Sequence, residues 1–178
     1  MRKGALCLIF IAGLCGILLT GCPYSSVYTL DPEPALPINE DYLGKWAVLV
    51  NTNSNFGEPV KLILSKKSDT EYAVAFTGDV KELLRYRISL SDTLKGTGYL
   101  STVDHWEFLN FVIRGEVFII QILYDKNKLT LLPMAESFTN KHIGSDQQLR
   151  EALRFHMKTR LRPRYDDDFC LRNMVRVN

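Results

Sequence analysis

The sequence predicts a mainly β fold: a small antiparallel barrel of about eight strands, with one late α-helix followed by a closing strand. Three observations favour it. Short apolar runs alternate with turn residues from residue 42 to residue 133, a pattern typical of antiparallel strands. Residues 145–161 place apolar side chains at helical spacing, and a last apolar run follows at 169–177. Barrel closure would remove the exposed strand edges that invite aggregation.

The expected strands are short runs rich in β-branched and aromatic residues that end at Asn, Ser, Gly or Asp. The clearest alternation of apolar and polar residues falls at 84–90 and predicts a half-buried strand. Residues 106–113 and 116–124 are expected to form a hairpin around Arg114-Gly115. Gly96-Thr97-Gly98 is interpreted as a turn. The other expected strands are 46–50, 60–64, 72–77, 99–103, 129–132 and 169–177.

The central hairpin is apolar on both of its faces. In its first strand, Phe108 and Val112 alternate with Leu109 and Phe111, and the second strand repeats the pattern. Alternate residues of a strand point to opposite faces of the sheet, so only one of these faces can line the barrel interior. The other face needs a cover. The helix near residues 145–161 is the obvious candidate, and a partner subunit, which would make a homodimer, is the alternative.

The helix is predicted to begin at a capping box, with Ser145 at the N-cap and Gln148 at the third helical position. Pro163 is expected to end it. One helical face carries the apolar spacing. The residues on that face are Leu149, Ala152, Leu153, His156 and Met157.

The N-terminus has the layout of an export signal. Arg2 and Lys3 precede an uncharged apolar run, as in secretory signal peptides. The run ends in Leu19-Thr20-Gly21-Cys22, which resembles the bacterial lipobox. The resemblance implies that residues 1–21 are a signal peptide and that Cys22 is the lipid attachment site. Acyl chains on this cysteine would then anchor the protein in a membrane.

An uncleaved transmembrane anchor is the alternative, because no charge appears from Gly4 through Leu30. In lipoproteins of double-membraned bacteria, the residue after the lipidated cysteine influences sorting. Pro23 rather than Asp at that position implies the outer membrane, with the domain facing the periplasm. Residues 22–41 are expected to be the lipidated cysteine and a proline-containing tether, and residues 42–178 the barrel domain.

Tyr42-Leu43-Gly44-Lys45-Trp46 resembles the Gly-x-Trp that opens the first strand of lipocalin-like barrels. In that family the Trp closes one end of the barrel and a late Arg packs over it. The exported part as a whole is similar to uncharacterised lipocalin-like lipoproteins of bacteria, including their Leu-Thr-Leu-x-Pro strand end, here residues 129–133. Arg172 and Arg176 share a strand face opposite to that of Leu171, so both are expected to point outward.

Charge and cysteine content exclude several functions. Loss of residues 1–21 removes two basic residues, so the chain from Cys22 carries 20 basic and 20 acidic residues and lacks the positive charge of a nucleic-acid binder. Cys170 is the one cysteine left beside the lipidated Cys22, so no internal disulfide is expected. The thiol of Cys170 is expected to behave as a small apolar side chain in or beside a strand.

No catalytic, cofactor or metal site is expected. His105, His142 and His156 lack the spacing of a zinc helix, and His156 and His105 are expected as a packed residue and a turn residue. Asp166-Asp167-Asp168 lacks the spread ligands and the glycine of a calcium loop and is expected to be a solvated turn.

A basic cluster runs along the late helix and the segment that leaves it: Arg150, Arg154, Lys158, Arg160, Arg162 and Arg164. The favoured interpretation is a solvated face with Glu151 and the aspartate triplet as counter-charges. Contact with anionic lipid or another polyanion is the alternative.

Two functions from different classes remain open for such a lipoprotein. In the first, the barrel interior receives a small apolar molecule or an acyl chain. In the second, the barrel is filled by its own side chains and its surface docks on another envelope protein. An enzymatic activity is not expected, because no nucleophile–base pair is recognisable. The fold alone does not choose between the first two, since barrels host many functions.

Overall fold

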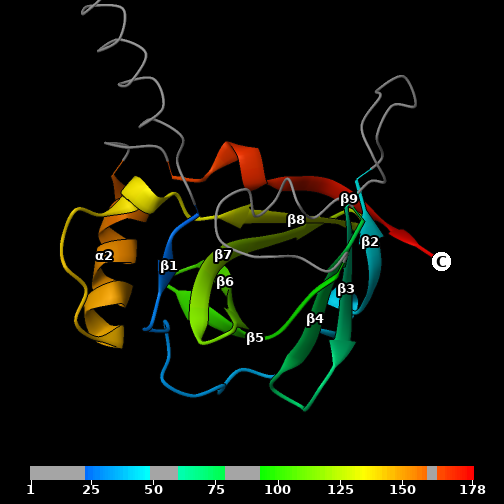
Figure 1. Cartoon of the computed structure of the whole chain (residues 1–178), viewed down its shortest axis with the longest axis horizontal. Coiled ribbons are helices and arrows are strands. Elements are labelled where there is room, and N and C mark those ends of the chain that lie inside the picture. The colour runs from blue at the N-terminus through cyan, green and yellow to red at the C-terminus, as the bar shows by residue number, and fades with distance from the viewer. Residues whose placement is uncertain (1–22, 49–59, 79–92, 160–163) are drawn as a thin grey trace, which may run out of the picture.

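The computed structural model describes residues 23–48, 60–78, 93–159 and 164–178. Its strands form one antiparallel sheet that closes on itself (Figure 1). Each strand from β2 to β8 pairs with the next along the chain, and β9 pairs with both β8 and β2. The barrel strands are β2 (Gly44–Ala47), β3 (Lys61–Lys66), β4 (Tyr72–Thr77), β5 (Thr93–Val103), β6 (Trp106–Ile113), β7 (Glu116–Asp125), β8 (Lys128–Pro133) and β9 (Leu171–Val177).

The predicted fold is confirmed: eight strands close the barrel, and a late helix precedes the closing strand. The strand expected at 84–90 lies outside the described residues. The turn expected at Gly96-Thr97-Gly98 is wrong, because these residues lie inside β5. A Cβ atom on Gly96 would lie 2.3 Å from the carbonyl oxygen of Val112 and 2.6 Å from the ring of Phe111. The glycine is therefore a site of close approach between β5 and β6 rather than a turn.

One end of the barrel is closed by Trp46 on β2, which is fully buried. Its indole Nε1–H donates to the carbonyl oxygen of Tyr42 at 2.8 Å. The guanidinium of Arg176 on β9 lies over the indole, 5.0 Å from the ring centroid, and donates to the carbonyl oxygen of Asp41. The expectation that Arg176 points away from the Trp is wrong. The register pairs Arg176 directly with Trp46, so the two side chains lie on the same face of the sheet. β9 carries one extra residue relative to β8 near Asn173, which has a positive φ, and this shifts the alternation after Leu171.

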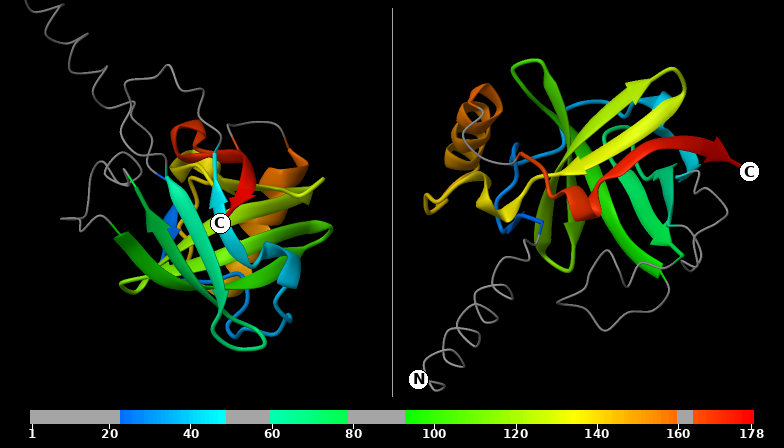
Figure 2. Two further views of the ribbon diagram at one scale, coloured as in Figure 1. Left: turned by 90° about the vertical axis from the view of Figure 1, so that its right-hand side faces the viewer. Right: turned by 90° about the horizontal axis from the view of Figure 1, so that it is seen from above.

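The central hairpin of β6 and β7 separates two apolar clusters, as its two-sided pattern predicts. Leu109 and Phe111 face the barrel interior. Phe108 and Ile119 face outward into a second cluster. The helix α2 (Asp146–Lys158) covers this outer face through Leu149, Leu153 and Met157, all buried. The helix thus covers this face, as the sequence predicts (Figure 2).

The helix begins as predicted and ends earlier. The hydroxyl of Ser145 accepts a hydrogen bond from the amide of Gln148 at 3.2 Å, which satisfies one of the free amides of the first turn. Thr159 is extended and terminates the helix at Lys158, before residues 160–163, which lie outside the described part of the chain.

The segment expected to be a tether, residues 23–41, lies against the barrel instead. It forms the short strand β1 (Ser25–Ser26), which pairs with Val117 and Phe118 of β7. It then passes between the barrel wall and α2 (Figures 1 and 2), where Leu30 is only 2% exposed. It ends in the 3-10 turn η1 (Glu40–Tyr42). Prolines exclude helix here but leave extended backbone free to pair and pack.

Polar contacts hold this segment, which we call the N-terminal strap, from both sides. The buried side chain of Asn110 on β6 accepts a hydrogen bond from the amide of Leu30 at 2.8 Å. From the helix side, Arg150 donates to the carbonyl oxygen of Leu30 and pairs with Asp31. Local sequence patterns do not predict the packing of this strap, because its hydrogen-bond partners lie 80 to 120 residues away along the chain.

Candidate functional site

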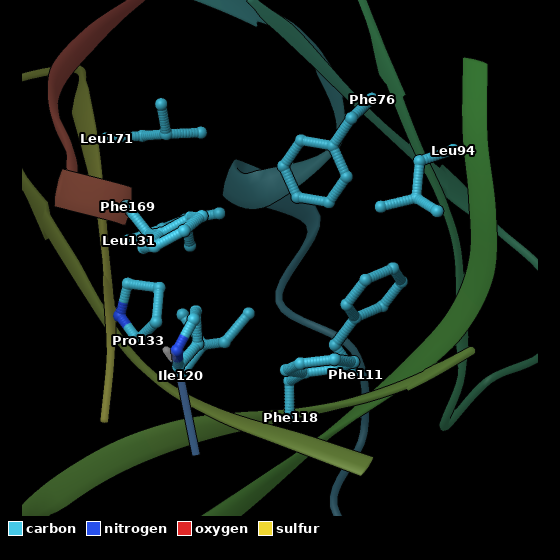
Figure 3. A pocket seen from close by; sticks show the side chains of 10 residues that line it. Phe76, Leu94, Phe111, Phe118, Ile120, Leu131, Pro133, Phe169 and Leu171 are labelled. Carbon is cyan, nitrogen blue, oxygen red and sulfur yellow. The ribbon is translucent and has the colours of Figure 1, made fainter. Parts of the chain in front are cut away.

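A small apolar cavity lies at the end of the barrel opposite Trp46. Its volume is about 60 Å³. Six barrel strands contribute side chains to its lining. Figure 3 shows Phe76 and Leu94 on one side of the cavity and Leu131 and Leu171 on the other. All ten of its lining residues in the described part of the chain are apolar: Pro23, Phe76, Leu94, Phe111, Phe118, Ile120, Leu131, Pro133, Phe169 and Leu171. We call this open end the mouth of the barrel.

Three aromatic side chains around the mouth contact one another, one pair edge to face and the other tilted. The rings of Phe76 and Phe111 are 5.6 Å apart with an interplanar angle of 69°. Those of Phe111 and Phe118 are 6.3 Å apart. Phe169 comes from the 3-10 turn η3 (Asp167–Phe169), which precedes β9. An all-apolar lining with no hydrogen-bonding side chain suits an alkyl chain better than a polar ligand.

The barrel below the mouth is filled by large side chains. Tyr124 packs edge to face against both Trp46 and Tyr42, with ring centroids 6.2 and 5.8 Å away. The hydroxyl of Tyr72 donates to the carbonyl oxygen of Asn39 and accepts from its amide. Burial raises the pKa of Tyr72 to about 12, so the phenol stays protonated and holds these hydrogen bonds at neutral pH.

Glu107 is the acidic group at this closed end. It stands on the same face of β6 as Leu109, so its side chain points toward the barrel interior. Burial raises the pKa of its carboxyl, although a hydrogen bond with Tyr42 opposes the shift. Its Oε1 atom is buried without a hydrogen-bond partner among the described residues. Sequence patterning did not single out this residue.

A second hollow lies outside the barrel, between α2 and the loop at 139–143. Its volume is about 430 Å³. Phe155 of α2 stands at this groove and is 63% exposed. Charged and polar side chains of Lys141, His142 and Glu151 share the lining. The groove is therefore larger than the mouth cavity but mixed in chemistry and open to solvent.

The structure places the other singled-out residues apart from the mouth cavity. His156 is buried on α2 against the ring of Phe138, as expected of a packed residue. His105 lies in the β5–β6 turn beside Trp106, also as expected. His142 is exposed at the outer groove. Cys22 lies outside the described residues.

Cys170 is a free, half-buried thiol directly before β9. Its Sγ lies 3.2 Å from the carbonyl oxygen of Asp166, to which it donates. Burial raises its pKa to about 11, so the thiol is protonated at neutral pH. A protonated thiol is a poor nucleophile.

The aspartate triplet is not the fully solvated turn that was expected. Asp166 is buried at 8% exposure, and its amide donates to the carbonyl oxygen of Pro133. Asp167 is exposed and pairs with Arg172 at 2.6 Å. Within the described ranges, the structure brings no three His, Cys, Asp or Glu side chains together as a metal site.

The basic cluster is largely paired, but not with the predicted counter-charges. Arg154 and Lys158 both pair with Asp104 of the β5–β6 turn, at 3.0 and 2.8 Å. Arg150 pairs with Asp31 of the N-terminal strap. Arg164 donates to the carbonyl oxygen of Met157. Arg160 and Arg162 lie outside the described residues. For the described residues of the cluster, Glu151 and the aspartate triplet are not the partners that were predicted, because tertiary packing brings other acids closer.

The closed end, the single late helix and the strand order together define a lipocalin-like β-barrel. No protein-family model, curated protein or solved structure matches the chain. Among the helices that the structure describes, none has the length and apolar content needed to cross a membrane.

Proposed function

We propose that this protein is a membrane-anchored envelope lipoprotein whose barrel holds an apolar group, such as the end of an acyl chain, at its mouth. The single observation that carries the binding role is the cavity lined by ten apolar residues at the open end. The lipobox-like Leu19-Thr20-Gly21-Cys22 carries the anchoring role. The location that these motifs favour is the outer membrane, with the domain facing the periplasm.

The size of the cavity limits what it holds. Small-molecule sites are commonly about 300–1,000 Å³ in volume, and an engineered apolar cavity of about 150 Å³ takes up benzene. At about 60 Å³, the mouth cavity has room for a chain end and not for a whole drug-sized molecule. The remainder of a bound lipid would lie outside the barrel, across the mouth.

Native mass spectrometry tests the binding role. The chain should begin at Pro23, because residues 23–41 pack on the barrel, and should be exported to a periplasm by a cleavable signal without a lipobox. We expect a discrete adduct of lipid-like mass that is lost on unfolding. The matched variant Leu94→Phe, which fills the mouth, should lose the adduct and keep its fold. Bare mass for both proteins would contradict the binding role.

The anchoring role has its own test. Cys22→Ser should abolish incorporation of labelled palmitate and release the protein from the membrane fraction. Unchanged labelling in this variant would refute the assignment of Cys22.

A second candidate function is docking on another envelope protein. The observation that favours it is the outer groove, where Phe155 is 63% exposed. An aromatic side chain in an open groove is typical of interface hot spots. In this case Phe155→Ser should weaken in-cell cross-linking to a partner and leave folding and lipid adducts unchanged.

A further inference from the structure

The N-terminal strap enters the barrel directly at its mouth. Pro23 forms an antiparallel bridge with Ala135, and the amide of Tyr24 donates to the carbonyl oxygen of Met134 at 2.8 Å. The ring of Tyr24 packs edge to face on Phe138, with the centroids 4.5 Å apart. These contacts fix the position of the first described residues against the barrel wall.

Pro23 is itself one of the residues that line the mouth cavity. Cys22 precedes it by one peptide bond, so their Cα atoms are about 3.8 Å apart. The chain therefore has no spacer between the proposed lipid attachment site and the mouth. The tether expected at residues 22–41 would have held the domain away from the bilayer. Residues 23–41 pack on the barrel instead, so they cannot act as a spacer.

We propose that the mouth of the barrel lies against the bilayer that holds Cys22, and that it takes an acyl chain directly from that membrane. The inference rests on the proposed lipid anchoring. Acyl chains on Cys22 lie in the hydrocarbon layer, so Pro23 is held at the membrane surface and the mouth is held there with it. The apolar lining then meets lipid instead of water, and a chain end enters the barrel without crossing the aqueous phase.

The two ends of β7 provide matched probes. Glu116 and Asp125 are both acidic and exposed, and they begin and end the same 10-residue strand. That strand spans about 30 Å. Glu116 lies beside the hairpin turn at the mouth, next to Phe118, whereas Asp125 lies at the closed end. A bilayer at the mouth is therefore close to one probe and distant from the other.

The experiment uses the full lipidated protein with Cys170→Ser, into which Glu116→Cys or Asp125→Cys is introduced and labelled with a fluorophore. Each protein is reconstituted in vesicles of phosphatidylethanolamine and phosphatidylglycerol that contain a lipid with a nitroxide on its headgroup. We expect several-fold stronger quenching at position 116 than at position 125. Equal quenching at the two positions, or stronger quenching at 125, would overturn the proposal.

A variant with a spacer after Cys22 tests whether the lipid anchor itself holds the mouth against the bilayer. A flexible Gly/Ser insertion between Pro23 and Cys22 should reduce quenching at position 116 and leave the anchoring intact. Unchanged quenching would mean that the lipid anchor does not set the orientation, and would also overturn the proposal. The intact mass of each protein is measured first. Absence of a lipid on Cys22 would refute the anchoring itself, a failure distinct from that of the orientation.

Discussion

The closed end and the mouth of the barrel are both rich in aromatic side chains but use them differently. At the closed end, Trp46 donates to Tyr42 and lies under Arg176, so directional contacts fix its position. At the mouth, Phe76 and Phe111 pack among apolar residues and leave a cavity of about 60 Å³. Hydrogen bonds and stacking have preferred directions and so specify one arrangement of side chains. Apolar contacts have no preferred direction, so an apolar cavity can be empty or occupied without loss of a specific bond. The closed end therefore has one specified arrangement, whereas the mouth has the kind of packing that the proposed binding role requires.

The largest expected effect comes from removing the indole at the closed end. Trp46→Ala deletes a fully buried side chain and should cost about 3–5 kcal/mol of unfolding free energy. The matched change at the mouth, Phe118→Ala, should cost about 1–2 kcal/mol because that ring is only partly buried. Urea unfolding of both variants measures the difference. Equal losses would mean that the two ends contribute alike to stability.

The next effect tests the close approach of β5 and β6 that gives the mouth its shape. Gly96→Ala places a Cβ 2.3 Å from the backbone oxygen of Val112, so one strand must move. We expect a loss of about 1–3 kcal/mol. Thr97→Ala, the neighbouring change on the opposite face of β5, is the control and should have a smaller effect. A neutral Gly96→Ala would show that the strands yield easily there.

The fold was predictable where local patterning and packing agree. The two-sided hairpin, the capping box at Ser145 and the closing strand all appear where the sequence places them. The turn was wrongly predicted at Gly96 because glycine occurs both in turns and where strands approach closely, and only the contacts with Val112 and Phe111 distinguish the two. The position of Arg176 was missed for a similar reason. Simple alternation assigned Arg176 to the wrong face because the register of β9 with β8 shifts near Asn173, and a single sequence does not mark such a bulge.

The candidate site was less predictable than the fold. The mouth is assembled from six strands, one 3-10 turn and Pro23, and no local pattern records that these meet. In the sequence, Pro23 stands out only as the residue after Cys22 and as one of the prolines of the expected tether. Its role in the mouth depends on strap contacts such as that between Leu30 and Asn110, 80 residues apart. Long-range polar contacts of this kind leave no periodic signal in a single sequence.

A smaller loss of stability is expected when the guanidinium of Arg176 is removed from the closed end. Arg176→Ala removes a guanidinium 5.0 Å from the centroid of Trp46 and should cost about 1 kcal/mol. Arg176→Lys keeps the charge but loses the planar group that stacks on the ring, so it should recover only part of the loss. Unfolding midpoints of the two variants and the parent protein give the comparison. If the lysine variant fell as far as alanine, stacking rather than charge would be the stabilising contact.

The smallest effect concerns Glu107, the acid inside the closed end. Burial raises the pKa of its carboxyl above the usual 4.5, so the folded protein holds this proton more tightly than the unfolded chain does. Its contribution to stability is therefore greatest below pH 4.5 and decreases as the pH rises through the window above that value. Glu107→Gln cannot ionise, so it should remove this slope and make the variant more stable than the parent at neutral pH. Urea unfolding across that pH window measures the slope.

The control is Glu116→Gln, which changes an exposed acid at the mouth and should leave the slope as it is. An unchanged slope in Glu107→Gln would show that water reaches the carboxyl in the folded state. That outcome would remove the main contrast between the two ends, because the closed end would then be no better sealed than the mouth. A lost slope would mean that water is kept from the carboxyl at the closed end, so that the two ends differ in their access to solvent.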